Sequence, residues 1–93
     1  MSINFSNRVE VPGDVLVSDL DGESVLLNLQ TESYFGLDAV GASMWSAVTR
    51  AESIEAAYET LRGEWNVDPA LLRHDLASLI EQLAAEGLVR IHS

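Results

Sequence analysis

The chain has 93 residues, of which 47% are hydrophobic, so it is long enough for one small domain with its own apolar core. Fifteen acidic residues outnumber five basic ones, and the formal net charge of −10 disfavours binding to a phosphate backbone. The absence of cysteine excludes disulfides, thiolate metal ligands and cysteine nucleophiles. The N-terminus has no secretory signal pattern, and no apolar run approaches the roughly 20 residues of a membrane span. We therefore expect a cytoplasmic protein without a membrane segment.

Short alternating segments predict a three-stranded antiparallel sheet after an N-terminal stretch, residues 1–13, which we expect to be loose. Asp21-Gly22 is a strong signal for a two-residue hairpin turn. Pairing Leu29 with Tyr34 places apolar side chains on both faces of the sheet, so we expect part of each face to be covered. The predicted strands are residues 15–20, 24–30 and 33–37, joined by turns at Asp21-Gly22 and Thr31-Glu32.

Three helices are predicted to follow the sheet. Asp38, Ser53 and Asp68 are suitable N-cap residues, and Pro69 fits the first turn of the third helix. The third helix ends at Gly87, and residues 88–92 form a last short strand or an extended tail. Strands followed by helices indicate an α+β fold. We expect a single domain over residues 1–93 that resembles a winged helix-turn-helix, with a three-stranded antiparallel sheet ahead of three helices.

Few residues in this sequence suggest catalysis. His74 and His92 lack the surrounding ligands of a metal site, and no phosphate-binding loop or nucleophile elbow is present. We therefore expect no enzyme activity, no metal and no cofactor. The third helix presents mostly neutral or acidic side chains outward, which argues against a DNA-reading helix and against nucleic acid as a partner. An acidic helix-turn-helix regulator or a protein-interaction module remains an alternative.

The predicted third strand is a candidate binding site for an extended peptide. Residues 33–37 contain no Pro or Lys that would protect an edge strand from pairing. At an edge beside the third helix, this strand would accept a further strand through backbone hydrogen bonds, with apolar anchors near Tyr34, Leu76 and Leu79. The alternative that these side chains are simply core stays open.

The run LLNLQTESYFGLDAVGASMW, the later DLASLIEQL and the closing GLV resemble the PqqD family of leader-peptide-binding domains, also called RiPP recognition elements. The resemblance covers residues 15–89. It implies a winged-helix-like fold, with the leader bound as an extra antiparallel strand between the third strand and the third helix. It also implies that Gly41 and Trp45 hold the first helix against the sheet, whereas Asp75 either contacts the leader or caps a local network. The implied peptide-binding residues are Glu32, Ser33, Tyr34, Phe35, Gly36, Leu37, Leu72, Asp75, Leu76 and Leu79.

The same resemblance implies two partners, the leader region of a precursor peptide and a processing enzyme. A chain without a fused enzyme resembles two subgroups of the family. In lasso-peptide pathways, which we favour, the domain hands the precursor to a cysteine-protease-like leader peptidase before a cyclase closes the ring. In the PqqD type proper it serves a radical SAM enzyme, and a sactipeptide or related pathway also remains open. In each case the implied function is presentation of the peptide without chemistry.

Overall fold

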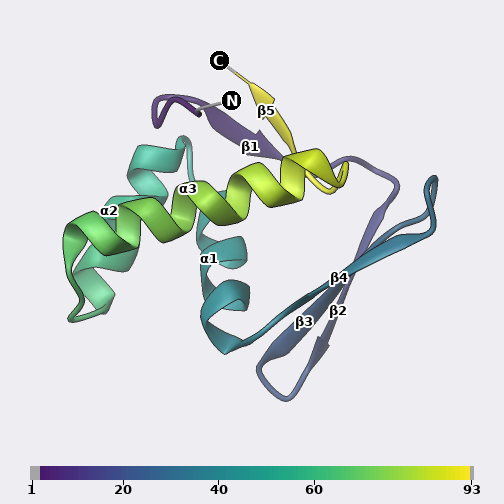
Figure 1. Ribbon diagram of the computed structural model, residues 1–93, viewed down its shortest axis with the longest axis horizontal. Coiled ribbons are helices and arrows are strands. Elements are labelled where there is room, and N and C mark those ends of the chain that lie inside the picture. The colour runs from purple at the N-terminus through teal and green to yellow at the C-terminus, as the bar shows by residue number, and fades with distance from the viewer. Residues whose placement is uncertain (1–2, 93) are drawn as a thin grey trace.

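The computed structural model describes residues 3–92 of the chain. It contains three helices and five strands, arranged as a three-stranded sheet beside a helical layer, with a small two-stranded ribbon where the chain ends meet (Figure 1). No helix among residues 3–92 is long and apolar enough to cross a membrane. The elements are β1 (Arg8–Glu10), β2 (Val15–Leu20), β3 (Glu23–Asn28), β4 (Ser33–Leu37), α1 (Ala39–Arg50), α2 (Ile54–Glu64), α3 (Pro69–Ala85) and β5 (Arg90–His92).

Each helix begins at its predicted N-cap. The Asp38 carboxylate accepts from the Gly41 amide at 2.8 Å, and Ser53 Oγ accepts from the Ala56 amide at 3.1 Å. The Asp68 carboxylate accepts from the first turn of α3, just ahead of Pro69. These side chains satisfy amides that lack partners within the helix, which fixes where the helices start. The predicted α+β order, three antiparallel strands followed by three helices, is confirmed.

The main sheet has the order β2-β3-β4, and all its pairs are antiparallel. Asp21 and Gly22 join β2 to β3 with positive φ angles of 51° and 84°, as a two-residue hairpin turn of the predicted kind requires. β4 has the predicted bounds, Ser33–Leu37, whereas β3 ends at Asn28, two residues before its predicted end at residue 30.

The turn between β3 and β4 is longer than the predicted two residues. Tyr34 pairs with Leu27 instead of Leu29, because residues 29–32 form the connection and Glu32 takes a positive φ of 59°. The Asn28 side chain stabilises this loop, since its carbonyl oxygen accepts from the amides of Gln30 and Thr31 at 2.9 and 3.3 Å. The predicted register is therefore wrong by two residues. Because the shift is even, the side chains within the strands keep their predicted faces, whereas Leu29 lies in the turn.

The helices cover one face of the main sheet and leave the other exposed. One face, called the inner face, packs on the helices and buries Ser24, Leu26, Asn28 and Leu37, with Phe35 half-buried against the core. The opposite, outer face carries Leu16, Leu20, Val25, Leu27 and Tyr34. Four of these five are exposed, with Tyr34 at 76%, and Leu27 is half-buried. We expected part of each face to be covered, and on the outer face the chain itself covers only Leu27 in part.

The hydrophobic core lies between the inner face and the helices. α2 and α3 contribute four buried side chains each, and those of α3 are Leu72, Leu76, Ile80 and Leu83. Leu26 of β3 meets them from the sheet and is fully buried. The four buried residues of α3 follow the 3.6-residue period predicted for the third helix. The sequence therefore determines which side of α3 faces the core.

The N-terminal segment is anchored, and the prediction of a loose stretch is wrong for most of its length; residues 1 and 2 lie outside the described part. β1 pairs with β5, so of the two alternatives for residues 88–92 the structure has the strand, at Arg90–His92, and this pairing buries Val9. The carbonyls of Asn7 and Phe5 accept from the first amides of α2, those of Ile54 and Glu55, both at 2.8 Å. The segment therefore satisfies the start of α2, a role that composition did not reveal.

Candidate functional site

The free edge of β4 is the centre of the candidate site. Among the described strands, β4 pairs with β3 alone, so its other edge has no strand beside it. Leu29 donates its amide to the Asp14 carbonyl, at 2.8 Å, which shows that alternate β3 residues bond to β2 and the others to β4. By this alternation Ser33, Phe35 and Leu37 bond to β3, whereas Tyr34 and Gly36 direct their N–H and C=O groups to the free edge.

Six residues, Glu32 to Leu37, were predicted to bond to the leader through their backbone. Of these, Tyr34 and Gly36 have N–H and C=O groups that are not used in pairing with β3. Glu32 already donates its amide to the Asn28 carbonyl at 2.8 Å. Phe35 points to the inner face and is half-buried, so its ring forms part of the surface next to the edge. A Cβ at Gly36 would meet nothing within 4 Å, so the backbone here is open to an approaching chain.

Asn28 fixes the end of this hairpin against α3. Its side-chain amide donates to the Gly87 carbonyl at 3.0 Å, while its carbonyl oxygen holds the turn before β4. Gly87 has a φ of +72°, and a Cβ there would lie 3.1 Å from that same amide nitrogen. Asn28 therefore sets the spacing between β4 and the C-terminal end of α3. The sequence offered one sign of this role, a polar residue within an apolar strand.

The helix side of the predicted site divides into buried and accessible residues. Leu72 and Leu76 are 3% and 0% exposed, which places them in the core and not at the surface. Asp75 is exposed and Leu79 is half-buried. Leu71, which sequence reasoning missed, is 56% exposed one helical turn before Asp75. We call the accessible stripe the open flank of α3; it consists of Leu71, Asp75, Ser78, Leu79 and Gln82.

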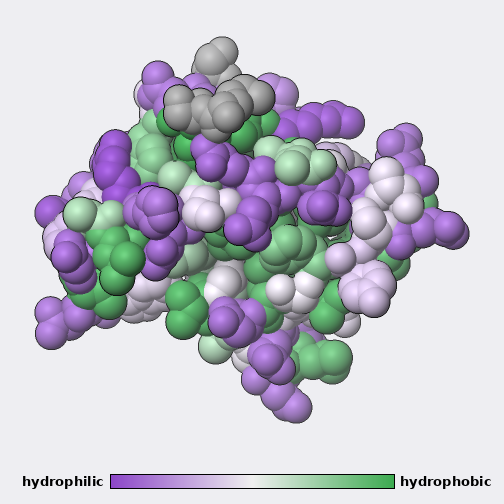
Figure 2. Space-filling view, viewed as in Figure 1, coloured by the Kyte–Doolittle hydropathy of each residue, from purple (hydrophilic) through white to green (hydrophobic). Residues whose placement is uncertain are grey.

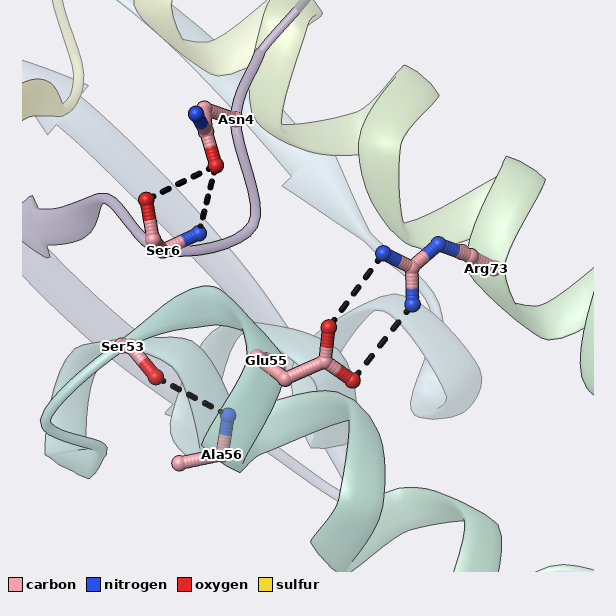
Figure 3. Close-up of polar contacts among 6 residues, drawn as sticks. All are labelled: Asn4, Ser6, Ser53, Glu55, Ala56 and Arg73. Atoms are coloured by element: carbon pink, nitrogen blue, oxygen red, sulfur yellow. Dashed lines mark hydrogen bonds and ion pairs between the residues drawn. The ribbon is translucent and has the colours of Figure 1, made fainter.

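The N-terminal segment lies on the opposite flank of α3. The Arg73 guanidinium stacks 3.9 Å from the centre of the Phe5 ring and donates to both carboxylate oxygens of Glu55, at 3.2 and 3.4 Å. Figure 3 shows this pair bridging α2 and α3 beside the N-terminal turn. Through these contacts and the pairing of β1 with β5, the segment is held away from the β4 edge.

A shallow hollow of about 830 Å³ opens next to this anchor, lined by Ile3, Asn4, Phe5, Ala70, Arg73, His74 and Ala77. Its one strong donor, Arg73, is already engaged by Glu55. On the other flank, apolar side chains reach the surface between α3 and β4 (Figure 2). The β4 edge combines free backbone groups with an apolar neighbour, and we therefore take it as the candidate site.

Gly41 and Trp45 lie where the predicted structural role requires. A Cβ at Gly41 would approach Leu37 Cδ2 to 3.2 Å, so this position lets α1 pack closely on the end of β4. Trp45 is buried in the core. Gly41 thus lies against β4, whereas Trp45 lies beside Val17 and Ser24 of β2 and β3.

Within residues 3–92, the titratable groups that form ion pairs do so at the surface. Among the described residues, no cluster of three or more His, Asp or Glu side chains is placed to hold a metal ion. His92 lies 2.9 Å from Glu10 across the β1–β5 ribbon. This hydrogen bond and the charge of His92, together with Arg90, hold the pKa of Glu10 below its usual value. The Asp75 side chain makes no hydrogen bond or ion pair within the described part of the chain.

Comparison with known proteins decides the family. A family model described as coenzyme PQQ synthesis protein D (PqqD) matches residues 23–89, from β3 to the residue before β5. The chain belongs to the PqqD family. The predicted resemblance is thereby confirmed, and β4, α1 and α3 all lie within the matched part. No curated protein matches the chain significantly.

Two solved structures are similar to this PqqD-family chain. One is TbiB1 in complex with the TbiA(beta) leader peptide, which is 34% identical, with a TM-score of 0.80 over 87% of this chain and 94% of TbiB1. The other is a lasso peptide synthetase B1 complexed with its leader peptide. It is 21% identical, with a TM-score of 0.76 over 91% of this chain and 98% of its own, and shows a shared fold.

Proposed function

We propose that this PqqD-family chain is a non-catalytic adaptor that binds the leader region of a ribosomally synthesised precursor peptide, as a RiPP recognition element. The observation that carries the proposal is the unpaired edge of β4, left free because the N-terminal segment is tied to α2 and β5. The 34% identity to TbiB1, whose structure contains a leader peptide, supports the same function.

In the proposed complex the leader forms a fourth strand along β4. Tyr34 and Gly36 offer one donor and one acceptor each, which allows about four backbone hydrogen bonds. At about 1 kcal/mol net per bond, these supply about 4 kcal/mol, which corresponds to a dissociation constant near 1 mM. Micromolar binding requires about 8 kcal/mol, so side-chain contacts must supply the other half.

The open flank of α3 is the proposed source of those contacts. Leu79 and Leu71 offer apolar surface, and Phe35 continues it from the sheet side. Asp75, which is exposed and unpaired among the described residues, is placed to accept from a leader side chain or amide. Leu72 and Leu76 support this flank from the core. Backbone bonds then give affinity for any strand, whereas the flank selects the sequence.

The adaptor presents its bound peptide to a processing enzyme and thereby raises the local concentration of the substrate. We propose a lasso-peptide pathway, in which the enzyme is a cysteine-protease-like leader peptidase followed by a cyclase. A lasso peptide synthetase B1 has the same fold, and TbiB1, which is 34% identical, binds a leader peptide, as this proposal requires of the adaptor. A radical SAM partner of the PqqD type is the second candidate, and the family model, described as coenzyme PQQ synthesis protein D, is consistent with that alternative.

Fluorescence anisotropy tests the proposal. A labelled leader from the precursor gene adjacent to this protein's gene should bind saturably, with a dissociation constant near or below the micromolar range. A scrambled leader of equal composition should bind at least tenfold more weakly, and a DNA duplex should not bind. Absence of saturable binding by the leader would refute the adaptor. Stimulation of a neighbouring peptidase, or of a radical SAM enzyme, then distinguishes the two pathways.

A further inference from the structure

The outer face of the main sheet is an exposed apolar surface, and leader binding along β4 would use only its margin at Tyr34 and Gly36. It carries Leu16 and Leu20 from β2, Val25 and Leu27 from β3, and Tyr34 from β4. Leu16 is 53% and Leu20 63% exposed, although each is paired in a regular antiparallel ladder. Apolar side chains that gather on one solvated face of a sheet mark an interaction surface more often than isolated ones do.

This face lies in an acidic part of the chain. Residues 11–49, which comprise the whole sheet and most of α1, contain six acidic residues and no basic one. Glu23 lies on the outer face by its register, and the turns at the two ends of the face contribute Asp21 and Glu32. The acidic residues are Asp14, Asp19, Asp21, Glu23, Glu32 and Asp38.

The basic residues leave the outer face without a positive charge among residues 11–49, and Arg50 lies beside Asp19 on the inner side of β2. All five are arginines that lie outside residues 11–49 in sequence. Arg62, Arg73 and Arg90 form ion pairs with acids on the helices and on β1. An isologous contact between two copies through the outer face would bring like charges together at its border, which disfavours a second copy as the occupant.

From this surface, and on the basis of the proposed adaptor function, we infer that the outer face docks the processing enzyme through a patch with an apolar centre and an Arg- or Lys-rich border. Apolar contact supplies the binding energy, and the opposite charges at the border speed and orient the encounter.

The position of the face explains how such an enzyme would meet its substrate. A strand added to β4 extends the same sheet, so every second leader side chain lies on the outer face beside Tyr34 and Gly36. An enzyme on that face contacts the adaptor and the bound leader together. It would therefore bind the loaded adaptor more tightly than the empty one.

Biolayer interferometry with the purified processing enzyme encoded beside the precursor tests this inference, with the immobilised adaptor measured both with and without leader. Leu16→Arg places a positive charge at the apolar centre, and Glu23→Arg reverses a border charge without disturbing the core. Each should weaken enzyme binding at least tenfold, while leader affinity by anisotropy stays within twofold. Glu64→Arg, at the exposed end of α2, gives the same charge change away from the face and should leave both values unchanged.

Three results would overturn the inference. The first is wild-type affinity for the enzyme in both outer-face variants, and the second is no enzyme binding by the wild-type protein, with or without leader. The third is a wild-type dimer that Leu16→Arg dissociates in sedimentation velocity. The last would assign the face to a second copy. Failure of the leader to bind appears separately in the anisotropy control and concerns the proposed function. Even if the leader does not bind, enzyme binding by the leader-free wild type and its outer-face variants still tests the docking surface.

Discussion

β2 and β4 are the two free edges of one sheet, yet they differ in ways that decide which of them can receive a peptide. β4 has no charged residue and no proline between Ser33 and Leu37. β2 carries Asp19 within its length and has Asp14 and Asp21 immediately outside its ends. Charged residues on an edge strand are a common protection against unwanted pairing. One edge is therefore protected, whereas the other is left open.

The surroundings of the two edges differ as well. β4 has the half-buried Phe35 and, on the adjacent layer, the open flank of α3 with Leu79. The hollow beside β2, of about 260 Å³, is lined in part by Asp19 and Arg50. An apolar side chain of a guest strand would meet charges there. An edge thus becomes a binding site when it has both free backbone groups and an apolar neighbour.

The largest effect on leader binding is expected from Gly36→Pro. Proline removes an outward amide at the free edge but no bond to β3, because Gly36 directs its backbone groups outward. It also leaves a carbonyl of the incoming strand without a donor, which costs about 1–3 kcal/mol. We expect leader affinity to fall about 10- to 100-fold in fluorescence anisotropy, with an unchanged circular dichroism spectrum.

Two controls separate the edges. Gly36→Ala keeps the amide and adds a Cβ into open space, so it should bind leader within twofold of the wild type. Val17→Pro removes an outward amide from β2, the protected edge, and should also leave leader binding unchanged. If Val17→Pro lost leader binding and Gly36→Pro retained it, the leader would bind along β2, and our proposal would name the wrong edge.

Asn28→Ala is expected to release the hairpin from α3. The variant loses the bond to the Gly87 carbonyl and both bonds to the turn before β4. Removing a buried polar side chain of this kind lowers the free energy of unfolding by about 1–2 kcal/mol. Urea unfolding measures this loss, and leader affinity should fall with it because the spacing between β4 and α3 is no longer fixed. Unchanged stability would show that the hairpin position has another cause.

Leu79→Ala tests the apolar neighbour of β4. Truncation of this half-buried side chain removes surface on the open flank, and we expect leader affinity to fall about three- to tenfold, or about 1 kcal/mol. Leu20→Ala is the matched truncation on β2, where the side chain is 63% exposed. It should leave leader binding unchanged. Equal losses in the two variants, measured by anisotropy, would remove the distinction between the edges.

Much of this difference was predictable from sequence, because it depends on local signals. The absence of charge in residues 33–37, the N-caps at Asp38, Ser53 and Asp68, and the helical period of α3 all act within a few residues. β4 and the three helix starts were accordingly predicted correctly. The family resemblance rested on the same local features and on their spacing.

The errors concern contacts between distant parts of the chain. The anchoring of Phe5 and Asn7 on α2 and the bond from Asn28 to Gly87 join segments about 50 residues or more apart, which no periodicity reports. The register error has a local cause instead, because the Asn28 side chain accepts from Gln30 and Thr31 and holds a longer turn than the two residues predicted. The apolar outer face contradicted the rule that exposed faces are polar, and such a departure is expected where a protein is built to bind.

Asp19→Val is expected to make β2 more like β4. The Asp19 carboxylate accepts from Ser24 Oγ at 2.6 Å, and its replacement leaves an edge strand without charge. Pairing of two such edges through about four backbone bonds predicts a weak dimer, with a dissociation constant on the order of 1 mM. Sedimentation velocity over a range of concentrations measures it. A variant that stays monomeric up to that range would show that β2 is protected by something other than this charge.

The smallest effect is expected from Glu10→Gln, which tests whether β1 stays with β5 and leaves β4 free. The folded-state pKa of Glu10 lies below its ordinary value of 4.5, chiefly through its hydrogen bond to His92. The contact therefore stabilises the fold above that ordinary pKa, and the stabilisation disappears as the pH falls through the lowered value. The melting temperature of the wild type should therefore decline as the pH falls, and in Glu10→Gln this decline should be smaller. Leader binding at pH 7 should stay unchanged, because the remaining β1–β5 bonds and the bonds from α2 to Asn7 and Phe5 still hold the N-terminal segment. Weaker leader binding in this variant at pH 7 would mean that a released N-terminal segment competes for the β4 edge.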